Sequence, residues 1–191
     1  MVANVLELHP VPFDHPDAVA LIAAVQQVYV DRYGATDVTP VDPAEFAAPR
    51  GFFVVGYLGG VPVANGGWRA RDSGVDPELR DGDAEIKRMY VVDGHRGRGF
   101  ARAVLADLER SAAAAGRARM VLETGTRQPE AMALYVSAGY APMPRFGAYR
   151  CAPNSRCFAK PVASEPAFEL VCDAARHPGG TAMRNTGVTH R

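Results

Sequence analysis

Residues 85–112 read EIKRMYVVDGHRGRGFARAVLADLERSA, an apolar run that passes through two closely spaced glycines into a helical pattern. The run 84–92 is predicted to be a strand, and apolar residues recur at helical spacing over 101–112. A glycine-rich turn between a strand and a helix presents unpaired backbone N–H groups at the positive end of the helix dipole, where anions bind. Guanidinium groups that suit phosphate lie close by, at Arg96, Arg98 and Arg102. The stretch therefore predicts a phosphate site formed by a strand, a loop and a helix.

Two familiar phosphate-binding motifs fit this loop poorly. A P-loop needs Gly-Lys followed by Ser or Thr, but Gly99 is followed by Phe100. The dinucleotide-binding fingerprint matches Gly97 and Gly99, but it places Arg102 where a third glycine is needed for close packing of helix and strand. Glu123, at the end of the next strand, is placed like the ribose-binding acid of that fold, so the dinucleotide alternative is weakened and stays open.

The flanking sequence predicts alternating helices and strands in a single α/β (α+β) domain over residues 1–162. A Gly-Gly pair at 59–60 separates two apolar runs and indicates a β-hairpin. The predicted helices are 16–32, a short turn near 43–47, 101 to about 115, and a helix that begins at Pro129 and stops at Gly139. The predicted strands are 52–58, 61–70, 84–92, 118–124, 148–151 and 156–161. Residues 163–191 have weak periodicity and are expected to form a tail with at most one short helix.

The composition excludes several other classes of protein. At 191 residues, of which 48% are apolar and 22% charged, the chain suits one globular domain. It has no apolar run of membrane-spanning length and no signal-peptide pattern, so we expect a cytoplasmic protein without a membrane partner. Its 21 basic residues balance 21 acidic ones, which argues against a nucleic-acid partner. Three cysteines without paired spacing indicate neither a disulfide framework nor a metal site.

Two segments together resemble the GNAT superfamily of acyl-CoA-dependent N-acyltransferases. The family motif is Gln or Arg, two residues, Gly, one residue, then Gly or Ala, and Arg96-Gly97-Arg98-Gly99-Phe100-Ala101 matches it between a strand and a helix. The segment ETGTRQPEAMALYVSAGY at 123–140 is similar to the family's later strand, helix and tyrosine region. With the preceding hairpin, the resemblance covers about residues 5–162.

The resemblance implies a fold, a donor and the residues that hold it. The family has a central, mostly antiparallel sheet of six or seven strands flanked by helices, splayed apart between the strands that end here at Val92 and Thr124. Pantetheine of acetyl-CoA lies in that gap. By resemblance, the backbone of Met89, Tyr90 and Val91 bonds the pantetheine arm. The pyrophosphate lies on the loop and helix residues Arg96, Gly97, Arg98, Gly99, Phe100, Ala101 and Arg102.

Acetyl transfer to an amine needs a proton acceptor, an oxyanion donor and a proton for the departing thiolate. Tyr135 matches the family tyrosine that protonates the sulfur. Glu85 lies where some members place a glutamate that accepts the amine proton, and strand alternation puts Glu85, Lys87 and Met89 on one face. The oxyanion donor is expected to be a strand amide near Met89 or Tyr90. Arg69, late in the hairpin, is a candidate to face the acceptor.

The leading function is therefore acetyl transfer from acetyl-CoA to the amine of a small molecule, by direct attack in a ternary complex. Two alternatives stay open: a protein or peptide N-acetyltransferase, and a non-catalytic module that binds acetyl-CoA as a signal. The sequence also allows a homodimer through the late strands or the tail.

Overall fold

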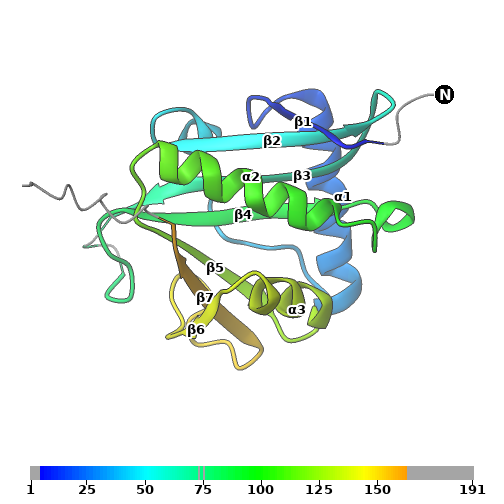
Figure 1. Cartoon of the computed structure of the whole chain (residues 1–191). Coiled ribbons are helices and arrows are strands. Elements are labelled where there is room, and N and C mark those ends of the chain that lie inside the picture. The colour runs from blue at the N-terminus through cyan, green and yellow to red at the C-terminus, as the bar shows by residue number, and fades with distance from the viewer. Residues whose placement is uncertain (1–4, 73, 75, 163–191) are drawn as a thin grey trace, which may run out of the picture.

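A computed structural model describes residues 5–72, 74 and 76–162 (Figure 1). Within them, seven strands form one sheet in the order β1-β2-β3-β4-β5-β7-β6, antiparallel except between β4 and β5. The strands are β1 (Glu7–Pro10), β2 (Gly51–Leu58), β3 (Val61–Arg71), β4 (Asp83–Val91), β5 (Arg119–Gly125), β6 (Ala141–Met143) and β7 (Ser155–Pro161). The predicted fold, a mostly antiparallel sheet flanked by helices, is confirmed.

Helices cover both faces of this sheet (Figure 1). One face carries α2 (Phe100–Ala114) and α3 (Pro129–Ser137), and the other carries α1 (Pro16–Tyr33) and the 3₁₀ turn η1 (Pro43–Phe46). A second 3₁₀ turn, η2 (Asp93–His95), links β4 to the glycine loop. The apolar stripe of α2, which includes Val104, Leu105 and Leu108, is almost fully buried against β2, β3 and β4. The predicted helices are therefore confirmed to within one or two residues.

The sheet splits between its two parallel strands. Pairing joins β4 to β5 only where Asp83–Glu85 faces Arg119–Val121, and beyond it the two strands diverge (Figure 1). The remaining backbone of β4 therefore has no partner strand on its β5 side, which leaves ladder groups for a ligand to complete. The predicted splay between these strands is confirmed.

A bulge in β4 changes which side chains share a face. The register with β3 shifts between Asn65 and Gly67, and Arg88 opposite this shift has a φ of 55°, in the left-handed region. Lys87 and Glu85 still lie together as an ion pair, but Met89 packs with α2 on the opposite face. The expectation that Glu85, Lys87 and Met89 share one face is therefore wrong for Met89, because the extra residue reverses the alternation.

The late part of the chain departs from prediction at one strand. Residues 148–151 form turns, and the additional strand is instead β6, whose central residue is Pro142. Proline is tolerated there because β6 is the edge of the sheet and pairs only with β7. The edge strand β1 was not expected. The expected tail, 163–191, lies outside the described residues, and none of the described helices is long and apolar enough to cross a membrane.

Candidate active site

A cleft of about 790 Å³ occupies the gap between β4 and β5. Its walls also come from α1, the glycine loop, the start of α2 and α3. The sequence-predicted residues that line it are Met89, Tyr90, Val91, Arg96, Gly97, Gly99, Phe100, Ala101, Arg102 and Tyr135. Arg98 is not among the lining residues, and Glu85 lies in a neighbouring pocket. The volume is that of a small-ligand or cofactor site.

The glycine loop forms an open cradle at one end of the cleft. Gly97 and Gly99 have φ angles of 73° and 83°, a region that L side chains rarely adopt, and Gly99 is the N-cap of α2. The first helical bond is donated by the Ala103 amide to the Gly99 carbonyl, so the amides of 100–102 have no helical acceptor. A Cβ at either glycine would meet no atom within 4 Å, so the space above the loop is open. These features fit a bound phosphate.

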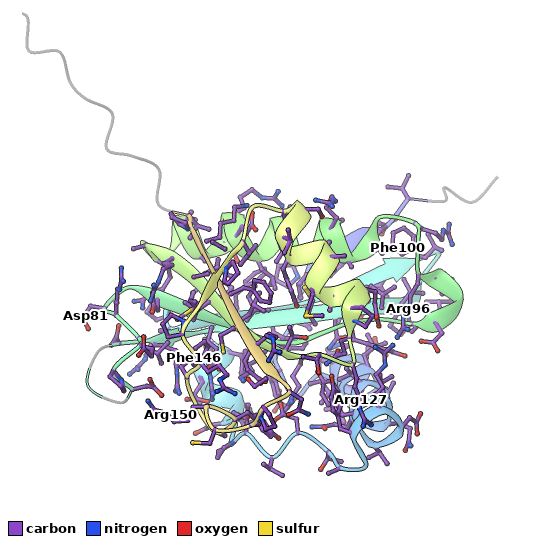
Figure 2. All side chains as sticks on the ribbon, turned by 90° about the horizontal axis from the view of Figure 1, so that it is seen from below. Asp81, Arg96, Phe100, Arg127, Phe146 and Arg150 are labelled. Atoms are coloured by element: carbon purple, nitrogen blue, oxygen red, sulfur yellow. The ribbon has the colours of Figure 1, made fainter. Side chains whose placement is uncertain are left out.

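The three arginines of the loop are held differently. Arg96 donates from Nε to the Val91 carbonyl at 3.1 Å and pairs with Asp93 at 2.7 Å, so it is fixed to the end of β4. Arg102 donates to Ser137 Oγ of α3 at 2.6 Å. Arg98 lies over the Phe100 ring at 4.8 Å and contacts His95. Figure 2 shows Arg96 and Phe100 together at one end of the molecule, away from Phe146 and Arg150.

The side chain of Tyr135, in α3, forms part of the wall of the cleft. It is 7% exposed, and its ring packs against Tyr140 and Phe158 at centroid distances of 5.7 and 6.4 Å. Burial raises its pKa above the usual phenol value, so the hydroxyl is protonated at neutral pH. The group can therefore donate a proton but cannot serve as a base near neutrality.

A second pocket of about 400 Å³ opens beside the cleft. We call it the side pocket; its floor is β3 and β4, and its walls are the segments 39–45 and 146–149. Lys87, Glu123 and Tyr149 line both cavities, so the two spaces meet at these side chains. Arg69, a candidate to face the acceptor, lines this pocket.

Glu85, the predicted base, is enclosed by cations in the side pocket. It is 2% exposed, and its carboxylate contacts Lys87 Nζ at 2.8 Å, Arg69 Nε at 2.9 Å and Arg71 Nε at 3.3 Å. Burial alone would raise its pKa, but the cations, Lys87 foremost, outweigh burial and lower the pKa. A carboxylate held in this way is a weak proton acceptor. The base role of Glu85 stays a prediction, and its surroundings favour a structural role.

Glu123 has the opposite environment at the junction of the two cavities. Ser155 Oγ donates a hydrogen bond to Glu123 Oε1 at 2.9 Å. Burial raises the pKa of Glu123 above the usual carboxyl value, against the lowering effects of that bond and of Lys87. A carboxylate with a raised pKa beside the cleft is a better general base than Glu85. From the sequence, Glu123 was considered only as a ribose-binding acid. Its place in the same segment as Tyr135 is the signal that could have indicated a role in the reaction.

The wall made by residues 34–42 is fastened to the sheet by side chains. Asp37 pairs with Arg88 of the β4 bulge, and Arg69 Nη1 donates to the Pro40 carbonyl at 2.9 Å. The Val38 amide donates to Tyr149 Oη at 2.8 Å. Arg88 is 5% exposed, so its ion pair is screened from water and connects this wall to the bulge.

Comparison with known proteins identifies the family. The model of the acetyltransferase (GNAT) family matches residues 22–140. The chain belongs to the GNAT acetyltransferase family. The glycine loop, the diverging strands β4 and β5, and Tyr135 all fall within the matched GNAT region.

Individual relatives agree with this assignment. The chain is 33% identical over 144 residues to an IAA acetyltransferase of Azospirillum brasilense, covering 75% of this chain and 90% of that protein. It is 30% identical over 120 residues to human N-acetyltransferase 8, covering 59% of this chain but about half (48%) of the human protein. A Klebsiella pneumoniae structure assigned to the acyl-CoA N-acyltransferases superposes with a TM-score of 0.67 at 25% identity, covering 83% of this chain and 99% of that one. The protein is thus an acetyltransferase of a family that generally takes its acyl group from acyl-CoA.

Proposed function

We propose that this GNAT protein transfers the acetyl group of acetyl-CoA to the amine of a small molecule by direct attack in a ternary complex. The observation that carries the proposal is the position of Glu123, where the cleft and the side pocket meet. Acetyl-CoA fits the cleft with its pyrophosphate on the glycine loop, and the acceptor enters from the side pocket. The thioester and the amine then meet beside a group suited to take a proton.

Each chemical step has a residue in reach of this junction. Glu123 accepts the proton of the amine, whose nitrogen attacks the thioester carbonyl carbon. A backbone amide near Met89 or Tyr90, on the unpaired side of the bulged strand, stabilises the oxyanion. The C–S bond breaks, and Tyr135 donates its phenolic proton to the leaving thiolate. The products are the N-acetylated amine and coenzyme A; Glu123 then releases its proton to solvent and Tyr135 regains one from solvent, so the cycle consumes no net proton.

We assign the base role to Glu123 rather than Glu85 because their environments push their pKa values in opposite directions. Three cations surround Glu85, whereas burial raises the pKa of Glu123, which lines both cavities. The small-molecule acceptor is supported by the walls of the side pocket, which loops cover on two sides. A peptide acceptor is the alternative, and a regulatory binding module would have no need of Glu123 at the junction or of Tyr135 in the cleft.

Steady-state kinetics with acetyl-CoA and a panel of amines and peptides tests the proposal. We expect Glu123→Gln to lower kcat by about 10²–10⁴-fold without weakening acetyl-CoA binding, and to abolish the acidic limb of the pH–rate profile. In the wild type this limb lies above the usual glutamate pKa, because the pKa of Glu123 is raised. Tyr135→Phe should also lower kcat.

Tyr140→Phe is the matched control for the tyrosine. Its ring packs against Tyr135, but Tyr140 does not line the cleft, so its hydroxyl should be dispensable for turnover. Full activity of Glu123→Gln with an unchanged pH profile would contradict the assignment of the base. Acetylation of peptides but not of small amines would contradict the acceptor class.

A further inference from the structure

Among the described residues, five tyrosines line the cleft, and the proposed mechanism uses one of them. They are Tyr29, Tyr33, Tyr90, Tyr135 and Tyr149. The hydroxyls of Tyr33 and Tyr149 fasten the walls, since each accepts a hydrogen bond from a backbone amide, at 3.1 and 2.8 Å. The ring of Tyr90 lies under the Arg96 guanidinium at 5.7 Å, beside the glycine loop. Tyr29 is therefore the cleft tyrosine that still has no role.

Tyr29 lies in the middle of the face that α1 turns toward the cleft. The α1 residues that line the cleft follow one another at helical spacing: Val25, Val28, Tyr29, Arg32 and Tyr33. One end of this face lies against the end of β5, because a Cβ at Gly125 would be 2.1 Å from Tyr33 Oη. Tyr29 comes one helical turn before Tyr33, and Glu123 comes two residues before Gly125. The cleft thus brings Tyr29 and Glu123 to a common wall.

The hydroxyl of Tyr29 is available to a ligand. Within the described part of the chain it makes no hydrogen bond, and it is not sealed in the interior, so it faces the cleft. Burial raises the pKa of Tyr29 to about 12, although the nearby charge of Arg88 acts to lower it and those of Asp37 and Glu123 act to raise it. The hydroxyl is therefore protonated at neutral pH and can donate a hydrogen bond.

Tyr29 and Tyr135 reach the cleft from opposite faces of the sheet. Tyr29 comes from α1 and Tyr135 from α3, which cover the two faces (Figure 1). The two phenols are close enough that Tyr29 contributes to the raised pKa of Tyr135. A thioester between them presents a sulfur and a carbonyl oxygen, which are bonded to the same carbon. Tyr135 serves the sulfur, so the carbonyl oxygen is the atom left for Tyr29.

We propose that Tyr29 is a catalytic residue whose hydroxyl donates a hydrogen bond to the carbonyl oxygen of the thioester. The proposal rests on the proposed function and adds a second donor for its oxyanion, beside the backbone amide near Met89 or Tyr90. A carbonyl oxygen has two lone pairs and can accept from both donors. The proton stays on Tyr29, and the hydrogen bond strengthens as negative charge develops on the oxygen.

Tyr29→Phe removes the hydroxyl and keeps the ring. We expect kcat to fall by about 10²-fold or more while KM for acetyl-CoA stays nearly the same, because the bond is stronger in the transition state than in the ground state. The acidic limb of the pH–rate profile should not move, since Glu123 is intact. Thermal unfolding should match that of the wild type, since the free protein loses no hydrogen bond.

Infrared spectroscopy of bound acetyl-CoA, labelled with ¹³C at the thioester carbonyl, detects the hydrogen bond without any acceptor amine. A hydrogen bond to the oxygen lowers the carbonyl stretching frequency, so the band should lie at higher frequency in Tyr29→Phe than in the wild type. Tyr135→Phe should leave the band near its wild-type position, because the Tyr135 proton goes to the sulfur.

Tyr57→Phe is the matched control. The Tyr57 hydroxyl also contacts α1, where it donates to Asp17 at 2.7 Å, but Tyr57 lines neither cavity. Its kcat and carbonyl band should equal those of the wild type. An unchanged band in Tyr29→Phe would overturn the hydrogen bond to the carbonyl, and a shifted acidic limb would mean that Tyr29 acts through Glu123 instead. Both results would leave the acetyltransferase proposal standing, whereas failure to bind acetyl-CoA and to acetylate any amine would overturn both proposals.

Discussion

Replacing Glu85 by glutamine tests whether its carboxylate stabilises the fold or acts as the catalytic base. The substitution keeps the shape of the side chain but leaves Arg69, Arg71 and Lys87 without the carboxylate that contacts all three. Removing one partner from a buried ion pair costs about 3–5 kcal/mol. For a chain of this size, each kcal/mol corresponds to about 2–4 °C, so we expect Tm to fall by roughly 6–20 °C.

Urea and thermal unfolding at neutral pH measure this effect, with Glu7→Gln as the control. The Glu7 side chain is 66% exposed and, among the described residues, forms its ion pair with His9, so its loss should cost less than about 1 kcal/mol. Because the pKa of Glu85 is lowered in the fold, its stabilisation is present above the usual value of 4.5 and is lost as pH falls through the folded pKa. The difference in the free energy of unfolding between the wild type and Glu85→Gln should therefore decrease at acidic pH. Unchanged stability combined with a shifted pH–rate profile would refute the structural role and restore Glu85 as the base.

Two further substitutions probe the bulge and the cleft wall. Arg88→Gly and Arg88→Ala both remove the ion pair with Asp37, but only glycine adopts the φ of 55° without strain. In urea unfolding, the Arg88→Ala protein should therefore be less stable than the Arg88→Gly protein by about 1 kcal/mol. Equal stability of the two variants would mean that the bulge relaxes. Gly125→Ala places a Cβ 2.1 Å from Tyr33 Oη and should lower the free energy of unfolding by about 1–3 kcal/mol. Adding Tyr33→Ala to the same chain should recover part of this loss. Additive effects in that double-mutant cycle would contradict the contact.

Local patterns predicted most of the fold and most of the residues that line the cleft. The glycine loop, the helix after it and the hairpin at 59–60 depend on residues that are neighbours in sequence, so their signals are direct. The short strands β1 and β6 gave no such signal, because each has only three or four residues and contains a proline. Their pairing with β2 and β7 decides their structure.

The side pocket was predicted less well because its properties come from contacts between distant segments. Glu85 and Glu123 look alike in sequence, yet nearby cations lower the pKa of Glu85 and burial raises the pKa of Glu123. The bulge at Arg88 likewise has no periodic signature, although it reverses the face of Met89. Such differences follow from which strands and loops meet, and only the folded chain reveals them.

The central claim is that acetyl-CoA binds with its pyrophosphate at the start of α2, and a calorimetric titration of two variants tests it most directly. Ala101 is the second residue of α2 and lines the cleft. Ala101→Glu places a negative charge at the N-terminus of α2, where the charge interacts favourably with the helix dipole but repels a bound phosphate. Ala101→Gln is the neutral control of equal size. We predict that the wild type and Ala101→Gln bind acetyl-CoA, that Ala101→Glu binds at least about tenfold more weakly than Ala101→Gln, and that NAD does not bind. Equal affinity of the two variants, or a preference for NAD, would contradict the account.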